Sequence, residues 1–200
     1  MSDNYGSVKE PIIMKYKIIS LLVLIIAVHG CSLLKGKSEM AVSSEVVEEK
    51  SEEIVVISTN KGIIKLGLYP EAAPETVANF EKLINQKFYD GLTFHRYVSD
   101  FVIQGGCPLG TGTGGPGWSI PGEFQNLELS QKMPKHRKGV LAMARSQDPD
   151  SAGSQFYICL ATASHLDGSY TSFGRVIEGI EVVDELRQDD VMETVRLEEK

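Results

Sequence analysis

Residues 94–106 read Phe94-His95-Arg96-Tyr97-Val98-Ser99-Asp100-Phe101-Val102-Ile103-Gln104-Gly105-Gly106. The run is rich in β-forming residues, and side chains two apart on a strand share a face. Phe101 and Ile103 are therefore expected on one face, and Val102 and Gln104 on the other. The cation of Arg96 and the amide of Gln104 lie close in sequence to these apolar side chains. This combination predicts a pocket that holds a neutral polar group of an otherwise apolar substrate.

Similar short runs surround this stretch on both sides. Strands are expected over residues 54–57, 63–69, 93–98, 101–105, 139–144, 155–160, 171–176 and 193–198. Apolar residues at helical spacing predict one helix over 75–87, opened by Pro74, and a second near 179–187. Many short strands with two helices favour a mainly β, closed antiparallel barrel over a doubly wound sheet.

The composition limits the classes of function. The chain has 200 residues, 42% hydrophobic and 24% charged, which fits one globular domain plus additional chain and excludes a disordered or fibrous protein. The net charge of −7 gives no reason to expect a nucleic-acid partner. Three scattered cysteines are too few for a disulfide framework or a cysteine zinc site, and the four histidines lack metal-ligand spacing. We therefore expect no metal.

The N-terminal 30 residues have the pattern of a targeting signal. The apolar run over residues 18–28 is too short to span a bilayer comfortably, which takes about 20 residues. Lys15 and Lys17 supply the positive flank of a secretory signal peptide. Translation is predicted to begin at Met14, because residues 1–13 do not resemble a charged leader. A buried core helix is the alternative, but polar residues follow at once.

The sequence Val28-His29-Gly30-Cys31 resembles a bacterial lipobox, although His29 departs from the usual small or aliphatic residue. Lipidation at Cys31 is therefore predicted, with a soluble secreted protein as the alternative. Residues 31–53 are rich in Ser, Glu and Lys and predict a flexible acidic tether. Residues 54–200 form the predicted domain. The expected location is a bacterial membrane-anchored lipoprotein at the periplasmic face or cell surface.

Two other patterns have simpler explanations. Residues 110–115 satisfy the dinucleotide pattern G-x-G-x-x-G, but Pro116 and Gly117 follow where a helix would have to begin. We interpret the stretch as a loop whose glycines adopt positive φ. Ser154 lacks the G-x-S-x-G elbow of a hydrolase, and His95 is interpreted as a structural histidine.

Several motifs, two within residues 94–106 and the others beyond them, occur in a recognisable order. They are Phe94-His-Arg96, Phe101-x-x-Gln-Gly-Gly106, Gly112-Thr-Gly-Gly115, Leu141-Ala-Met-Ala144, Gly153-Ser-Gln-Phe-Tyr-Ile-Cys159, Leu166-Asp-Gly168 and Phe173-Gly-Arg-Val176. From about Val55 to the C-terminus, the chain resembles the cyclophilin family of peptidyl-prolyl cis-trans isomerases. The resemblance implies an eight-stranded antiparallel β-barrel capped by two α-helices, and an enzyme that accelerates rotation about X–Pro bonds.

The resemblance also implies roles for individual residues. Arg96 donates to the prolyl nitrogen during rotation, Gln104 holds Arg96, and Phe101 completes the catalytic group. The implied substrate-binding residues are Val102, Gly112, Ala144, Arg145, Ser146, Gln155, Tyr157, His165, Leu166 and Tyr170. No cofactor, metal or covalent nucleophile is needed. The partners are proline-containing polypeptides, and the protein is expected to be a monomer that assists folding of exported proteins.

The chain departs from the common family pattern at several positions. They are Val102 for Met, Tyr157 for Phe, Arg145 for Asn, His165 for Trp, Tyr170 for His, and Ser99-Asp100 for Pro-Gly. The hydroxyl of Tyr157 needs a hydrogen-bond partner. Position 145 acts through its backbone in the family, so Arg145 should be tolerated. The smaller ring of His165 on the pocket rim predicts weak binding of cyclosporin.

Two alternative functions and one chemical question remain at this level. The chain could be a non-catalytic module that only binds proline-containing segments, although retention of Arg96 argues against this. It could also be a surface-exposed lipoprotein in which the isomerase is incidental. Nothing in the sequence places Cys107 and Cys159 within disulfide distance, so two free thiols are predicted.

Overall fold

The computed structural model describes residues 53–198. The predicted signal peptide, the start at Met14, the lipidation site Cys31 and tether residues 31–52 lie outside the described residues. Eight antiparallel strands form one curled sheet in the order β3-β4-β6-β5-β7-β2-β1-β8. The strands are β1 Glu53–Thr59, β2 Gly62–Leu68, β3 Arg96–Val98, β4 Val102–Gly105, β5 Val140–Met143, β6 Phe156–Cys159, β7 Ser172–Glu178 and β8 Met192–Leu197.

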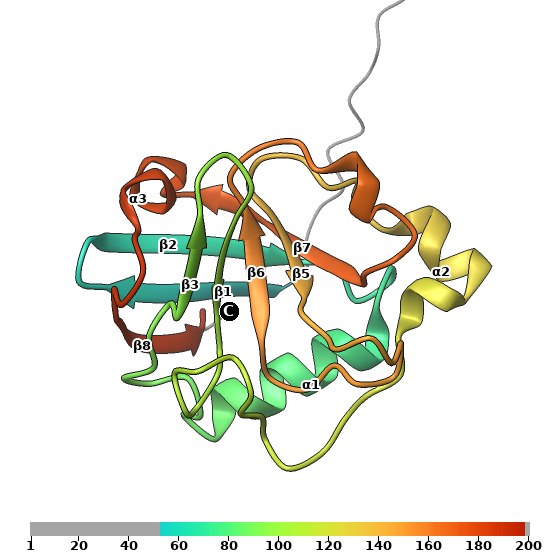
Figure 1. The fold of residues 1–200 in the computed structure, drawn as a ribbon, viewed down its shortest axis with the longest axis horizontal. Coiled ribbons are helices and arrows are strands. Elements are labelled where there is room, and N and C mark those ends of the chain that lie inside the picture. Colours follow the sequence, from blue (N-terminus) through green and yellow to red (C-terminus); the bar gives the residue numbers. More distant parts are fainter. Residues whose placement is uncertain (1–52, 199–200) are drawn as a thin grey trace, which may run out of the picture. The chain divides into compact units, whose positions relative to one another are not determined.

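The two predicted helices are confirmed. The first, α1 (Pro74–Asn85), buries Phe80 and Leu83 in the main core, and the second, α3 (Ile180–Glu185), lies beside β2 (Figure 1). Proline suits the first turn of a helix because its missing N–H has no partner there. Within the described part a third helix, α2 (Leu127–Lys132), was not predicted, because its six residues bury no side chain. The side chain of Asn126 caps it by accepting from two backbone amides.

The start of α1 depends on a residue far away in the sequence. Ala73 precedes the helix and has no side-chain oxygen that could cap it. Instead, the carboxylate of Glu123 accepts hydrogen bonds of 2.9 Å from the backbone amides of Glu75 and Thr76. Glu123 belongs to the short 3-10 helix η1 (Glu123–Gln125) and is buried. A negative charge at the positive end of the helix is favourable.

Strands β4, β5 and β6 are apolar along nearly their whole length because both of their faces are covered. Ile103, Leu141 and Ile158 pack into the main core, whereas Val102 and Tyr157 belong to a second cluster on the opposite face. Neighbouring side chains on a strand point to opposite faces, so one strand can serve two apolar environments. The second cluster positions the functional site.

The two edges of the sheet, β3 and β8, meet only briefly in the described chain. An isolated bridge pairs Thr93 with Val191, and Phe94 exchanges backbone hydrogen bonds with Asp189 and Asp190. The continuous ladder of the expected closed barrel is not shown. The architecture that the structure establishes is mainly β, with eight antiparallel strands curled into a half-barrel.

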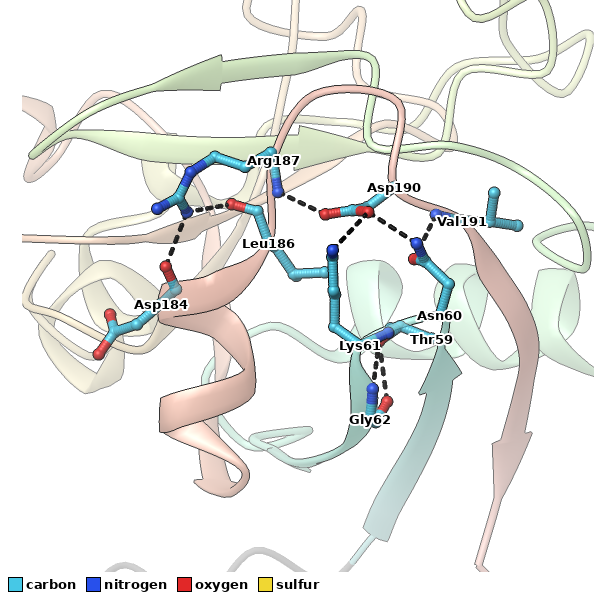
Figure 2. Close-up of polar contacts among 9 residues, drawn as sticks. All are labelled: Thr59, Asn60, Lys61, Gly62, Asp184, Leu186, Arg187, Asp190 and Val191. Carbon is cyan, nitrogen blue, oxygen red and sulfur yellow. Dashed lines mark hydrogen bonds and ion pairs between the residues drawn. The ribbon is translucent and has the colours of Figure 1, made fainter.

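A polar network ties the β1–β2 turn to the segment between α3 and β8 (Figure 2). The buried carboxylate of Asp190 accepts 2.7 Å hydrogen bonds from the Asn60 side chain and the Arg187 backbone amide. Lys61 lies 3.8 Å from the same carboxylate. The Arg187 guanidinium in turn lies 4.8 Å from the ring centroid of Tyr97 on β3. This network therefore braces the edge strand that carries Arg96.

Candidate active site

A pocket of about 170 Å³ opens on the outer face of the sheet. Nine of the predicted site residues line it: Arg96, Phe101, Val102, Gln104, Ala144, Arg145, Tyr157, Leu166 and Tyr170. Strand register explains part of this grouping, because Arg96 on β3 pairs with Gln104 on β4, and Gln104 pairs with Tyr157 on β6. Directly opposed residues on neighbouring strands place their side chains close together on one face. The pairing thus places the Arg96 cation, the Gln104 amide and the Tyr157 ring in one row across the three strands.

Arg96 is exposed at the open side of the pocket, and Gln104 lies beside it. The guanidinium Nη1 is 3.4 Å from Gln104 Oε1, which is a long contact for a hydrogen bond. The centre of the guanidinium lies 6.0 Å from the ring centroid of Phe101. Arg96 is therefore loosely held and can still donate to a ligand.

Gln104 connects Arg96 to the glycine-rich loop. Its Nε2 donates across 3.0 Å to Oε1 of Gln155. The Nε2 of Gln155 donates in turn to the carbonyl oxygens of Gly112 and Gly114, each at 2.8 Å. The amides of both glycines donate to the Sγ of Cys107 at 3.2 Å. A continuous chain of hydrogen bonds therefore runs from Cys107 to Arg96.

The loop prediction for residues 110–115 is confirmed. Gly110 and Gly112 have φ of +65° and +83°, and the segment contains no helix. The residue assignment that fails is the face of Phe101. It lies before β4, after Asp100 at φ +57°, and it packs with Val102 in the second cluster instead of with Ile103. The turn breaks the two-residue alternation that the prediction assumed.

The rim of the pocket is formed by residues around the 3-10 helix η2 (Ser164–Leu166). His165 stacks on Phe101, with ring centroids 5.6 Å apart and an interplanar angle of 21°. Leu166 contributes an apolar wall, and Tyr170 meets Tyr157 edge to face at 6.0 Å. His165 thus covers Phe101 from outside.

Arg145 has a structural function through its side chain. Its Nη2 and Nε donate to the carbonyl of Ser169 at 2.7 and 3.1 Å, and its Nη1 donates to the carbonyl of Ser146 at 2.8 Å. The guanidinium also lies over the ring of Tyr170 at 4.6 Å. Arginine at this position therefore fastens the rim segment to the loop that follows β5.

A second cavity of about 420 Å³ adjoins the first and shares Gln104, Ala144 and Arg145 with it. The predicted residues Gly112, Ser146 and Gln155 line this cavity. Sequence reasoning did not identify another lining residue, Trp118. Its Nε1 donates to Asn79 Oδ1 at 2.9 Å, and Lys82 lies 4.1 Å from its ring centroid. The sequence signal that could have identified Trp118 is that it is the single tryptophan of the chain.

Two histidines, the buried His136 and the partly buried His95, were not assigned to the site from sequence. The Tyr157 hydroxyl is hydrogen-bonded to His136, with 3.0 Å between the oxygen and Nε2. The hydroxyl therefore has the partner that the sequence predicted. Asp167 contacts the other ring nitrogen of His136 at 2.9 Å. His95 lies beside Gly112, and both of its ring nitrogens are shielded from solvent. Burial lowers the pKa of His95.

The thiols of Cys107 and Cys159 are both free, as predicted, and both residues are buried. Burial raises the pKa of Cys159 to about 12. Among residues 53–198, no cluster of His, Cys, Asp or Glu could hold a metal ion. In the same range, no helix combines the length and apolar character needed to cross a membrane.

Comparison with known proteins places this geometry in a family. Residues 54–200 match the family model described as cyclophilin type peptidyl-prolyl cis-trans isomerase/CLD. Peptidyl-prolyl cis-trans isomerase B of Bacillus subtilis is 51% identical over 135 residues, covering 68% of this chain and 90% of that protein. A peptidyl-prolyl cis-trans isomerase of Helicobacter pylori is 44% identical over 155 residues, covering 74% and 91%.

Solved structures agree with this assignment. A cyclophilin type peptidyl-prolyl cis-trans isomerase of Cryptosporidium parvum, crystallised in the presence of the dipeptide Ala-Pro, superposes with a TM-score of 0.66 at 30% identity. The match covers 74% of this chain and 99% of that one. With the family model matched over residues 54–200 and relatives of 44–51% identity, the chain belongs to the cyclophilin family of peptidyl-prolyl cis-trans isomerases.

Proposed function

We propose that the 170 Å³ pocket binds the proline ring of an X–Pro segment and that Arg96 assists rotation of its peptide bond. The observation that carries the proposal is the placement of one exposed guanidinium at the edge of a pocket walled by Phe101, Leu166 and Tyr157. Apolar walls suit the ring of proline, and the cation suits a polar atom beside that ring. The Ala-Pro dipeptide present with the Cryptosporidium parvum relative supports a ligand of this class.

The chemistry requires only an aligned donor. Amide resonance gives the peptide bond a rotational barrier of about 18–20 kcal/mol. Rotation breaks the resonance and leaves a lone pair on the prolyl nitrogen. A donor directed at that nitrogen binds the twisted state better than either planar state, and this difference lowers the barrier. Arg96 keeps its proton at physiological pH, so it acts by electrostatics and hydrogen bonding.

Residues that flank the proline would occupy the second cavity. It shares Gln104, Ala144 and Arg145 with the first, and it is lined by the glycine loop and Trp118. The long contact between Arg96 and Gln104 suits this mechanism, because a guanidinium has further N–H groups to offer the substrate. Gln104 therefore orients the guanidinium of Arg96 and leaves its other N–H groups available to the substrate.

The test is an isomerisation assay on a short proline peptide with the full-length protein and its Arg96→Ala variant. We expect the substitution to lower kcat on the order of 100-fold, as loss of a transition-state donor does. KM should change little, and the circular dichroism spectrum should be unchanged. Arg96→Lys should restore only part of the rate, because an ammonium lacks the planar fork. Near wild-type turnover in Arg96→Ala would overturn the proposed role of Arg96, whereas absence of turnover in the wild type would favour the rival assignment, a module that only binds proline segments.

We also propose that the enzyme acts on exported proteins while attached to a membrane through lipid at Cys31. The support is the signal-like run over residues 18–28 and the lipobox-like sequence that ends at Cys31. Mass spectrometry of the mature protein should find a lipid-modified N-terminus at Cys31. Cys31→Ser should move the protein to the soluble fraction, and a variant that stays fully membrane-bound would contradict the anchor.

The curled sheet is proposed to close into a barrel at the Thr93–Val191 bridge. The backbone hydrogen bonds between Phe94 and Asp190 support this closure. Slow amide hydrogen exchange at Phe94 and Met192 would be the expected result, and fast exchange at both would indicate an open edge.

A further inference from the structure

Three polar side chains form a hydrogen-bonded row behind the proline pocket. The hydroxyl of Tyr157 lies 3.0 Å from His136 Nε2, and His136 Nδ1 lies 2.9 Å from Asp167 Oδ1. Tyr157 comes from β6, His136 from the segment between α2 and β5, and Asp167 directly follows the pocket wall residue Leu166. The side chain of His136 is only 1% exposed. The imidazole is therefore shielded from water, whereas the Asp167 side chain is 23% exposed and Tyr157 lines the pocket.

The hydrogen bonds define where the protons lie. Burial raises the pKa of Asp167, but hydrogen bonds from the backbone and side chain of His136 outweigh it and hold that pKa below its usual range. Asp167 is therefore a carboxylate that accepts from the His136 amide at 2.8 Å and from Nδ1. Neutral histidine with a proton on Nδ1 accepts at Nε2. Consequently the Tyr157 hydroxyl donates to His136, and its proton points away from the pocket.

His136 also connects the pocket to the rim through its backbone. The amide of Ala163 donates to the His136 carbonyl at 2.9 Å, and the His136 amide donates to Asp167. The segment between these two contacts carries Leu166 and His165. One residue thus supports both Tyr157 and the opposite wall, Leu166.

We propose that His136 is a positioning residue of the proline pocket: it takes up the Tyr157 hydroxyl, so that the wall facing proline stays apolar, and it fixes that wall relative to Leu166. The proposal rests on the proposed function of the pocket. His136 touches neither substrate nor Arg96, so it should influence substrate binding more than turnover.

Protonation of His136 reverses the row. The Nε2 then carries a hydrogen and donates, so the Tyr157 oxygen must accept and its own proton must turn elsewhere. The titratable and charged groups around His136 are Tyr157 on β6, Asp167 and His165 on the rim, and Lys135 on its own segment. Burial keeps the pKa of His136 below 6.5, against the opposing effect of Asp167. Mildly acidic pH should therefore weaken proline binding, while Arg96 stays charged.

Two substitutions of His136 distinguish its contact with Asp167 from its contact with Tyr157. In His136→Asn the side-chain amide can replace Nδ1 and keep the hydrogen bond to Asp167, but it is too short to reach the Tyr157 hydroxyl. In His136→Gln the longer amide can accept that hydroxyl but does not titrate. Tyr157→Phe removes the hydroxyl and leaves the ring wall in place.

The experiment measures kcat and KM of full-length protein on a proline peptide between about pH 5 and 8, a range around the ordinary histidine pKa. An unpaired buried donor predicts a KM roughly three- to tenfold higher at acidic pH in the wild type, with kcat unchanged. Tyr157→Phe and His136→Gln should show a flat KM. His136→Asn should have the raised KM at every pH. Melting temperatures identify any variant that has lost its fold.

Three results would overturn the inference. The first is a KM of Tyr157→Phe that rises at acidic pH as it does in the wild type. The second is an effect of acidic pH on the wild type that changes kcat and leaves KM unchanged. The third is a wild-type KM in folded His136→Asn. An inactive wild type would instead remove the proposed function itself, so the two failures are distinguishable.

Discussion

Gln104 donates a 3.0 Å hydrogen bond from its side-chain amide to the side-chain oxygen of Gln155. Gln104 belongs to β4 and faces Arg96, whereas Gln155 precedes β6 and holds the carbonyls of Gly112 and Gly114. The contact thus joins the strand pair that carries Arg96 to the loop that lines the second cavity. It follows that loop geometry and the position of Arg96 are coupled.

Gln155→Ala should lower kcat/KM of the peptide assay about two- to tenfold, because a typical net hydrogen bond contributes about 0.5–1.5 kcal/mol. Gln104 loses its acceptor in this variant, and Arg96 loses part of its support. The matched control is Gln131→Ala on the exposed surface of α2, which should behave as the wild type. Equal activity of the two variants would show that the contact between Gln104 and Gln155 does not reach Arg96.

The two buried thiols should ionise at different pH. Burial raises the pKa of Cys107, but backbone N–H groups of Gly114 and its loop neighbours outweigh it, so the net pKa lies below the ordinary 9.0. Cys159 has no such donors, and burial raises its pKa to about 12. Ultraviolet absorbance of thiolate in a Cys31→Ser background should therefore show two separate steps, and Cys107→Asp should remove the lower one. A single shared step would contradict the assignment.

Acid should destabilise the protein over a pH range set by the buried His136 and the partly buried His95. Burial lowers the folded-state pKa of both His95 and His136 below 6.5. The unfolded chain therefore binds more protons than the folded one as pH falls below 6.5, and stability drops until the lowered pKa is passed. The melting temperature should be flat above about pH 7 and should fall toward pH 5, in line with the ordinary histidine pKa. His95→Gln should fall less steeply, and a slope equal to that of the wild type would exclude His95 as a contributor.

His165→Trp should increase sensitivity to cyclosporin. His165 stacks on Phe101 at 5.6 Å, so a larger ring there would extend the apolar rim outward. The combined gain in apolar area and one hydrogen bond corresponds to roughly one to two decades in affinity, since about 1.4 kcal/mol is tenfold. Inhibition curves of the peptide assay give the comparison, with turnover expected to change less than inhibition. Identical inhibition of both proteins would disprove the role of this position.

Local patterns predicted much of this molecule. The strands lie within a few residues of their expected positions, because short runs of apolar β-forming residues between glycines favour strands over helices. Pro74 opens α1 as expected, and residues 110–115 form a loop because Pro116 and Gly117 prevent a helix there. The motifs predicted most lining residues of the pocket, since strand register alone brings Arg96, Gln104 and Tyr157 together.

Other features were decided by contacts between residues distant in sequence. Periodicity carries no information on which side chain meets the Tyr157 hydroxyl, and His136 is brought to it by the packing of the rim against β6. Glu123 caps α1 from 47 positions away, where no capping motif could be recognised. Phe101 joins the pocket because the turn at Asp100 ends the strand alternation. The sequence by itself determined the strands and the order of the residues along them, because these depend on the local chain. Tertiary structure decided how buried polar groups are paired, since each such group must find whichever partner the fold brings within reach.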